Sequence, residues 1–188
     1  MEFYVKGFVM TIYDFDNDFA HYEVDEETQK SLGQVWTPFH IIEQMMDKAG
    51  TIDDKSSIWY DETKTNLDPT MGAGNIVIAM LYRRIVQCDQ NPVVALSNVY
   101  GVELDNSTLN FARKRIVNFM HKISENLNIK IDFEKVNELV YEKNSFTNNP
   151  NPNFVCSDIF KWDIVNWKPK KSEIEEQTDV WHSLGVKV

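Results

Sequence analysis

The run NLDPTMGAGNIVIAM, residues 66–80, constrains the fold more than any other stretch of this chain. It places Gly72 and Gly74 one residue apart, between an Asp-Pro pair and an unbroken apolar run. Glycines inside regular elements cost stability, so such a cluster is expected where the backbone turns sharply or approaches a ligand. The run therefore predicts a short strand that ends at Asp68, a glycine loop, and a buried helix over about 74–86.

Strands and helices alternate along the rest of the chain. Apolar spacing in TPFHIIEQMMDKAG predicts a helix with Thr37 as its N-cap, Pro38 in its first turn and Gly50 at its end. We also expect a buried strand at about 97–103, a helix at about 107–127, and a short strand in FVCSDIF. The segment IKIDFEKV fits a strand or a helix, and NSFTNNPNPN is a loop by composition. This order predicts an α/β fold with a parallel sheet and flanking helices.

Composition narrows the classes of function. A formal net charge of -10 over 188 residues disfavours a large basic surface for nucleic acid. The acidic, aromatic run YDFDNDFAHYEVDEE is a solvated extension, an arm that binds a partner, or an acidic surface that imitates nucleic-acid phosphates. Cys88 and Cys156 are far apart and the four histidines are scattered, which predicts reduced thiols and no metal site. No membrane span or signal-peptide layout is found at the N-terminus, so we expect a cytoplasmic protein.

The predicted strand ends carry the groups of a ligand site. Ligands of open parallel sheets bind at the carboxyl ends of the strands. The dinucleotide fingerprint G-x-G-x-x-G is absent after Gly74, which disfavours a pyrophosphate ligand. Glu103 ends the second predicted strand, where its carboxylate would accept from both hydroxyls of a ribose. Asp158 ends the third, where it would accept from an adenine amine. The chain therefore predicts a site for an adenosyl ligand.

Taken together, these motifs resemble those of N6-adenine DNA methyltransferases that use S-adenosyl-L-methionine, especially type I modification subunits and related type II enzymes. GQVWTPFHIIEQMM is similar to their N-terminal motif, and DPTMGAG to their Asp-Pro-x-x-Gly-x-Gly loop. YGVELD matches their Gly-x-Glu motif, and CSDIF their third acidic motif. The resemblance covers about residues 32–160. It implies a Rossmann-like class I methyltransferase fold with an incomplete parallel sheet and S-adenosyl-L-methionine as the cofactor.

The resemblance also implies which residues contact the cofactor. They are Thr37, Pro38, Asp68, Gly72, Gly74, Glu103 and Asp158. The first two would close the site against the methionine end of the cofactor, and the next three would form the loop beneath it. The last two would bind the ribose and the adenine ring.

The sequence departs from the family at the catalytic motif. Family members carry Asn or Asp-Pro-Pro-aromatic on the fourth strand, and no such tetrapeptide occurs here. Asn166 in DIVNWKPK is the catalytic candidate at that position. We therefore expect an extension over 1–30, a cofactor-binding domain over 31–165 and a C-terminal tail over 166–188. The short sheet would expose one edge, to be covered by a partner, by self-association or by the N-terminal segment.

Three functions follow from this pattern. The first is a truncated or split adenine-N6 methyltransferase subunit that binds the cofactor and needs a second chain for catalysis and DNA contact. The second is a non-catalytic, acidic interaction protein on a methyltransferase scaffold, with an anti-restriction or regulatory role. The third is a small stand-alone, site-specific DNA adenine-N6 methyltransferase that uses Asn166.

Overall fold

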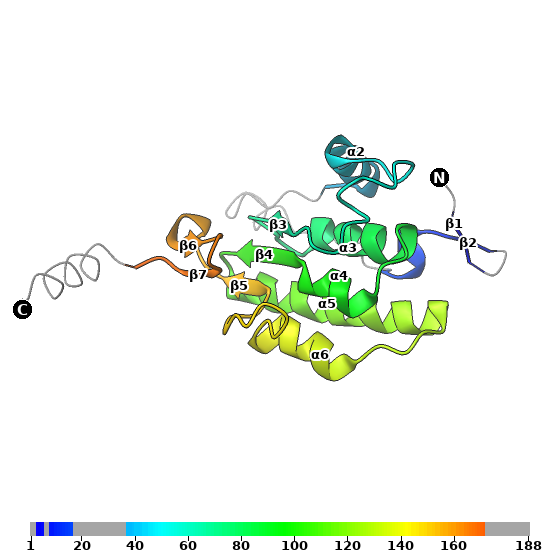
Figure 1. Cartoon of the computed structure of the whole chain (residues 1–188). Helices are drawn as coiled ribbons and strands as arrows, with labels where there is room; N and C mark the ends of the chain where they lie inside the picture. Colours follow the sequence, from blue (N-terminus) through cyan, green and yellow to red (C-terminus); the bar gives the residue numbers. More distant parts are fainter. Residues whose placement is uncertain (1–2, 6–7, 17–36, 172–188) are drawn as a thin grey trace, which may run out of the picture.

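The structure, a computed structural model, describes residues 3–5, 8–16 and 37–171 (Figure 1). Short 3-10 or π-helical segments are labelled η. In chain order the elements are β1 (Phe3–Val5), β2 (Phe8–Met10), η1 (Ile12–Asp14), α2 (Phe39–Ala49), β3 (Asn66–Asp68), α3 (Asn75–Tyr82), η3 (Arg83–Gln87), α4 (Pro92–Ser97), β4 (Val99–Glu103), α5 (Asn106–Leu127), α6 (Phe133–Asn137), η4 (Glu138–Glu142), β5 (Phe154–Cys156), η5 (Ile159–Lys161), β6 (Trp162–Asp163) and β7 (Lys168–Pro169).

A three-stranded parallel sheet in the order β3-β4-β5 forms the centre of the fold. Asp68 lies opposite Gly101, and Glu103 opposite Cys156. Because all three strands run the same way, their carboxyl ends meet at one edge of the sheet. The predicted α/β class and parallel sheet are therefore confirmed, with the strands adjacent in chain order.

The two faces of the sheet are covered by different elements. Side chains alternate along β4, so that Val99 faces the helices while Tyr100 and Val102 face the other way. Helices α3 and α5 cover the first face. The second face packs against Trp162 and Trp167, which belong to the segment after β5. Helices thus flank the sheet on one side in the described residues, and a tryptophan pair covers the other.

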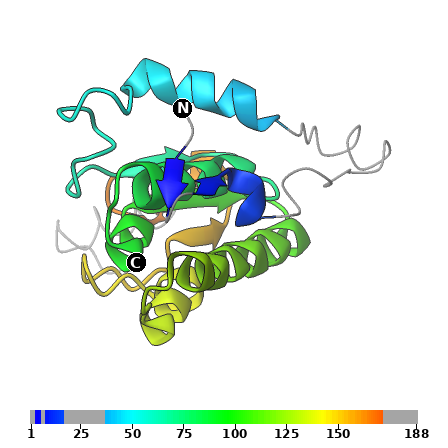
Figure 2. The same cartoon turned by 90° about the vertical axis from the view of Figure 1, so that its right-hand side faces the viewer.

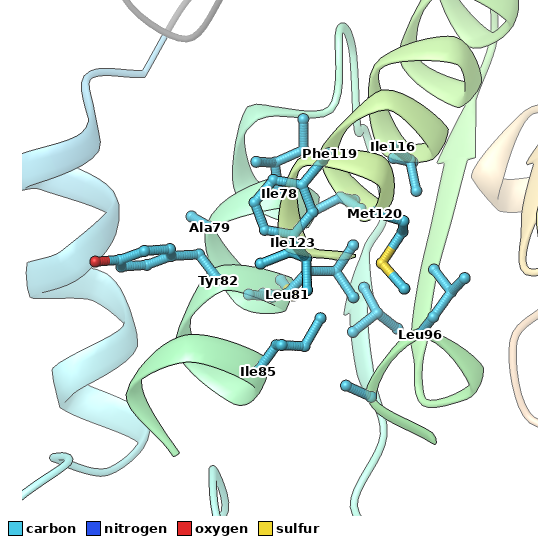
Figure 3. Packing of buried hydrophobic residues seen from close by; sticks show 14 of the residues in the cluster. Ile78, Ala79, Leu81, Tyr82, Ile85, Leu96, Ile116, Phe119, Met120 and Ile123 are labelled. Atoms are coloured by element: carbon cyan, nitrogen blue, oxygen red, sulfur yellow. The ribbon is translucent and has the colours of Figure 1, made fainter. Parts of the chain in front are cut away.

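The main core lies between the helices and the first face of the sheet. Figure 3 shows Ile78 and Leu81 of α3 meeting Phe119 and Ile123 of α5. Because α3 is enclosed by the sheet, α2 and α5, it is apolar nearly all round, as its sequence predicts. Helix α2 packs on α3, on the side opposite α5 and α6 (Figure 2). No helix in the described part of the chain is long and apolar enough to cross a membrane.

Part of the predicted N-terminal extension joins this core. Ile12 and Phe15 are buried, and the Phe15 ring contacts Tyr82 and Phe119 with ring centroids 5.8 and 6.1 Å away. Residues 17–36, which include most of the acidic run and the GQVW of the N-terminal motif, lie outside the described residues.

Several element boundaries differ from those predicted. Pro38, with ψ 148°, is the N-cap of α2, and Thr37 lies one residue before it. The prediction of Thr37 as the N-cap, with Pro38 in the first turn, was therefore wrong. The strand predicted from 97 starts at Val99, because residues up to Ser97 belong to helix α4, which Asn91 caps and which the sequence pattern did not predict. The ambiguous segment IKIDFEKV leads into helix α6. The long helix predicted over 107–127 is confirmed as α5.

The segment proposed as a fourth strand does not join the parallel sheet. β6 and β7 pair with each other as an antiparallel hairpin. Asp163 forms the turn, because its Oδ1 accepts from the backbone N–H of Val165 at 3.0 Å and of Asn166 at 3.1 Å. Trp167 then takes a positive φ of 50°, and its indole packs against the sheet. Placing Asn166 on a fourth parallel strand was therefore wrong.

Candidate functional site

The carboxyl end of β4 holds the side chain of Glu103 in a fixed position. Its Oε2 accepts from the N–H of Gly72 at 2.8 Å, and its Oε1 accepts from the N–H of Asp105 at 2.9 Å. A carboxylate has about four acceptor positions, two on each oxygen. One position on each oxygen therefore remains for a further donor. Because both oxygens are already anchored to backbone, the carboxylate cannot turn freely and is preorganised for a ligand with two donors.

The glycine loop between β3 and α3 lies beside Glu103. The N–H of Met71 donates to the carbonyl of Val102 at 2.9 Å, which ties the loop to β4. Gly72 and Gly74 have φ of 51° and 89°, which is backbone that side chains disfavour. A Cβ on Gly72 would meet nothing within 4 Å, whereas one on Gly74 would lie 3.4 Å from Ala112 Cβ. Gly74 thus permits close packing of α3 on α5, while Gly72 leaves its side of the loop open.

Arg115 of α5 supports this loop from beneath. Its Nη1 donates to the carbonyl of Ala73 at 2.7 Å and to Asn75 Oδ1 at 2.9 Å. Its Nη2 forms an ion pair with Asp16, and both side chains are buried. One guanidinium therefore joins the loop, the start of α3 and the N-terminal segment. The sequence alone did not single out Arg115, since the chain carries three basic residues in a row at 113–115 and only the fold shows which one points inward.

Asp68 at the end of β3 has an unusual environment. It is buried, and its Oδ1 accepts from the N–H of Thr70 at 3.2 Å. Its Oδ2 is buried as well and accepts no hydrogen bond from the described residues. Burial raises the pKa of Asp68 to about 6, and the negative charge of Glu103 adds to the shift. An unsatisfied buried carboxylate oxygen is costly, and it favours a cation or a donor placed beside it.

The end of β5 continues the same edge of the sheet. The N–H of Ser157 donates to the carbonyl of Glu103 at 2.9 Å, and Asp158 follows at once. Asp158 Oδ1 accepts from the N–H of Phe160 at 3.0 Å and so caps η5. Leu104, which follows Glu103, is 72% exposed, so its apolar side chain lies on the surface beside the buried acid. Leu104 could not be singled out from the sequence, because the exposure of a side chain depends on the fold.

Three predicted site residues are placed differently. Thr37 and Pro38 are half-buried before and at the start of α2, and no hydrogen bond among the described residues joins them to the glycine loop or to Glu103. Asn166 is exposed in the hairpin turn, where its Nδ2 donates to Asp163 Oδ2 at 2.8 Å. The structure therefore brings Asp68, Gly72 and Glu103 together, with the Asp158 backbone adjacent.

This arrangement, with a parallel α/β sheet and a glycine loop after its first strand, is compatible with a methyltransferase-like fold. A family model described as N-6 DNA methylase matches residues 18–185. The chain belongs to the N-6 DNA methylase family, because that match spans most of its length. No curated protein and no solved structure matches the chain. Family membership indicates a DNA-methyltransferase-like function.

Proposed function

We propose that this protein binds S-adenosyl-L-methionine across the carboxyl ends of β3, β4 and β5, in a Rossmann-like class I methyltransferase arrangement. It would serve as the cofactor-binding subunit of an adenine-N6 DNA methyltransferase. The observation that carries the proposal is the Glu103 carboxylate, fixed by two backbone N–H groups beside the open side of Gly72. Its two remaining acceptor positions suit the two neighbouring hydroxyls of a ribose.

Charge at the other side of the loop supports a cationic ligand. S-adenosyl-L-methionine carries a sulfonium and an ammonium group, and the unsatisfied Oδ2 of Asp68 offers a negative partner for a cation. A positive charge nearby would favour the ionised carboxylate and offset part of its burial cost. The bound cofactor would supply a methyl group ready for transfer, while Asp68 and Glu103 hold and orient it.

Leu104 and Asp158 complete the proposed site on its adenine side. The exposed Leu104 side chain offers an apolar surface for a flat ring, and Ile159 is half-buried after β5. The Asp158 carboxylate has one oxygen engaged with the N–H of Phe160. The other oxygen would accept from the exocyclic amine of adenine. Thr37 and Pro38, at the start of α2, are the contacts predicted for the methionine end of the cofactor.

The two edges of the sheet differ, and the β3 edge supports pairing with a protein partner, whereas the β5 edge is engaged by a side chain of this chain. On the outer edge of β5 the Arg113 guanidinium donates to the carbonyl of Phe154 and lies 5.5 Å from the Tyr141 ring. On β3 the N–H of Asn66 donates to the carbonyl of Asn98, on the β4 side. Neighbouring residues of a strand direct their backbone N–H and C=O groups to opposite sides, so those of Leu67 point to the outer edge. No hydrogen bond from the described residues reaches the Leu67 backbone.

An open strand edge is a template for pairing with another strand. We propose that a second polypeptide pairs with β3 and supplies the amine-accepting residues that this chain lacks. A second strand that pairs in parallel with β3 would end beside Asp68, next to the proposed cofactor.

The proposal is tested by thermal unfolding with S-adenosylhomocysteine and by methyl transfer. Ligand at about 100 times its dissociation constant should stabilise the protein by about 2.7 kcal/mol. Glu103→Ala should lose that stabilisation, whereas Glu125→Ala, at an exposed carboxylate far along α5, should keep it. The chain alone should transfer no label from tritiated S-adenosyl-L-methionine to adenine in duplex DNA. Transfer that Asn166→Ala abolishes would instead establish a stand-alone enzyme, and absence of ligand stabilisation would leave the interaction protein.

A further inference from the structure

The hairpin β6–β7 gathers lysines on one of its faces. Trp162 pairs with Pro169 and Asp163 with Lys168, while the N–H of Lys170 donates to the carbonyl of Lys161 at 2.9 Å. Side chains of paired residues lie on the same face of an antiparallel ladder, and neighbours in sequence lie on opposite faces. Because Trp162 faces the sheet, its neighbour Asp163 and the partner Lys168 lie on the opposite face. The hydrogen bond between Lys170 and Lys161 continues this pairing by one step beyond β6 and β7, which puts these two lysines on the same face as Lys168. We call Lys161, Lys168 and Lys170 the lysine face.

The acid within this face is already engaged by the turn. Asp163 accepts from two backbone N–H groups and from the Asn166 side chain, and these hydrogen bonds lower its pKa. Its carboxylate is thus held by the turn. Among the described residues of the hairpin, Lys161, Lys168 and Lys170 outnumber this one acid. The chain as a whole has a net charge of -10, so a face with three lysines and one acid is not expected from composition. Lys171 follows directly and is also exposed.

Large apolar side chains border the lysine face. Phe160 is 82% exposed and Val165 is 88% exposed, at the start of the hairpin and in its turn. The ammonium of Lys170 donates to the carbonyl of Phe160 at 2.9 Å, which keeps the lysine beside the aromatic residue. An exposed aromatic residue on the same hairpin as a set of lysines is the combination that binds unpaired bases and their phosphates.

The hairpin is also close to the proposed cofactor site along the chain and in space. Only η5 separates Asp158 from β6. Figure 1 shows β6 and β7 beyond the arrowheads of β4 and β5, at the end of the sheet where Glu103 lies. A polyanion held on the lysine face would therefore lie near the place from which a methyl group would be transferred.

We propose that the lysine face binds the phosphate backbone of nucleic acid and that Phe160 stacks on an unpaired base. The surface would give this chain its own contact with the acceptor, in addition to any contact made by a partner. The inference about the acceptor rests on the proposed function, but phosphate binding by the lysine face can be measured separately.

The test measures fluorescence anisotropy of a labelled single-stranded oligonucleotide and a labelled duplex at 50 to 200 mM salt. Three phosphate contacts predict that affinity falls by about 20- to 40-fold over this range. Lys161→Gln/Lys168→Gln/Lys170→Gln should remove most of this salt dependence and at least about tenfold of the affinity at 50 mM salt. Phe160→Ala should weaken the single strand more than the duplex.

A matched variant separates the lysine face from net charge. Lys48→Gln/Lys122→Gln/Lys130→Gln changes the charge equally on exposed parts of α2, α5 and the following loop, and it should bind nucleic acid like the unmodified protein. Equal losses of nucleic-acid affinity in both triple variants would overturn the proposal. Unchanged affinity in the hairpin variant would overturn it as well, and would leave an acidic protein as the partner of the lysine face. Stabilisation by S-adenosylhomocysteine should persist in both, so its loss would report on the cofactor site and not on this surface.

Discussion

Replacement of Asp68 by asparagine should stabilise the fold while it weakens the proposed cofactor site. Burial raises the pKa of Asp68 from 3.8 to about 6, so the folded protein holds this proton more tightly than the unfolded chain does. The ionised carboxylate therefore destabilises the fold, by a cost that is absent below pH 3.8, grows up to pH 6 and is complete above it. A shift of this size corresponds to about 3 kcal/mol.

An asparagine side chain carries no charge, so Asp68→Asn should raise the free energy of unfolding by up to about 3 kcal/mol at pH 7.5 and change it little at pH 4. Urea unfolding followed by circular dichroism at both pH values measures the difference. A variant that is less stable than the unmodified protein at pH 7.5 would refute the argument, because Oδ2 would then have a favourable partner in the folded state.

The same substitution should act in the opposite direction on the ligand. With a pKa near 6, roughly one tenth of Asp68 is ionised at pH 5 and roughly nine tenths at pH 7. If the ionised carboxylate attracts a cationic ligand, affinity for S-adenosyl-L-methionine should rise about tenfold between these pH values. Asp68→Asn should bind more weakly at pH 7 and lose this pH dependence. The same pH profile in both proteins would show that Asp68 does not contact the ligand.

Three further substitutions probe the loop and its surroundings. Gly101→Ala should destabilise the fold by about 1–3 kcal/mol in urea unfolding, because its Cβ would overlap Met71 Sδ; unchanged stability would contradict this close approach. Gly72→Ala should lower the free energy of unfolding by about 1 kcal/mol, because of its φ of 51°. It should also reduce the cofactor affinity measured by calorimetry, because the new methyl group enters the open side of the loop. Full affinity would place the ligand elsewhere. Asn144→Ala should cost about 2–3 kcal/mol, because the two N–H donors on the buried Nδ2 of Asn144 are shared among three acceptors, which include the carbonyl of Ser97 at 3.0 Å. A neutral effect on stability would contradict that network.

The sequence predicted the parts of the fold that depend on local pattern. Apolar periodicity predicts α5, and the Asp-Pro-glycine loop predicts the change from β3 to α3. Glu103 was placed correctly at the end of its strand, because an acid directly after a buried apolar run has few other positions. These features are short-range, and composition and spacing suffice to predict them.

Other features depend on contacts between distant residues. Arg115 could not be singled out, because its partners Ala73 and Asp16 lie far away in sequence. The sequence could not distinguish the turn at Asp163 from a fourth strand, because the packing of Trp167 on the second face of the sheet decides between them. The lysine face likewise emerges only from the register of the hairpin, since its members are spread over ten residues of sequence.

The most direct test of the account is a calorimetric titration of the purified protein with S-adenosyl-L-methionine, alongside Glu103→Ala and the control Glu125→Ala. The account predicts binding with a dissociation constant of about micromolar order in the unmodified protein and in the control, and at least about a tenfold loss in Glu103→Ala. Equal binding by Glu103→Ala would show that the carboxylate held by Gly72 does not contact the ligand. No binding by the unmodified protein would contradict the proposed cofactor site itself.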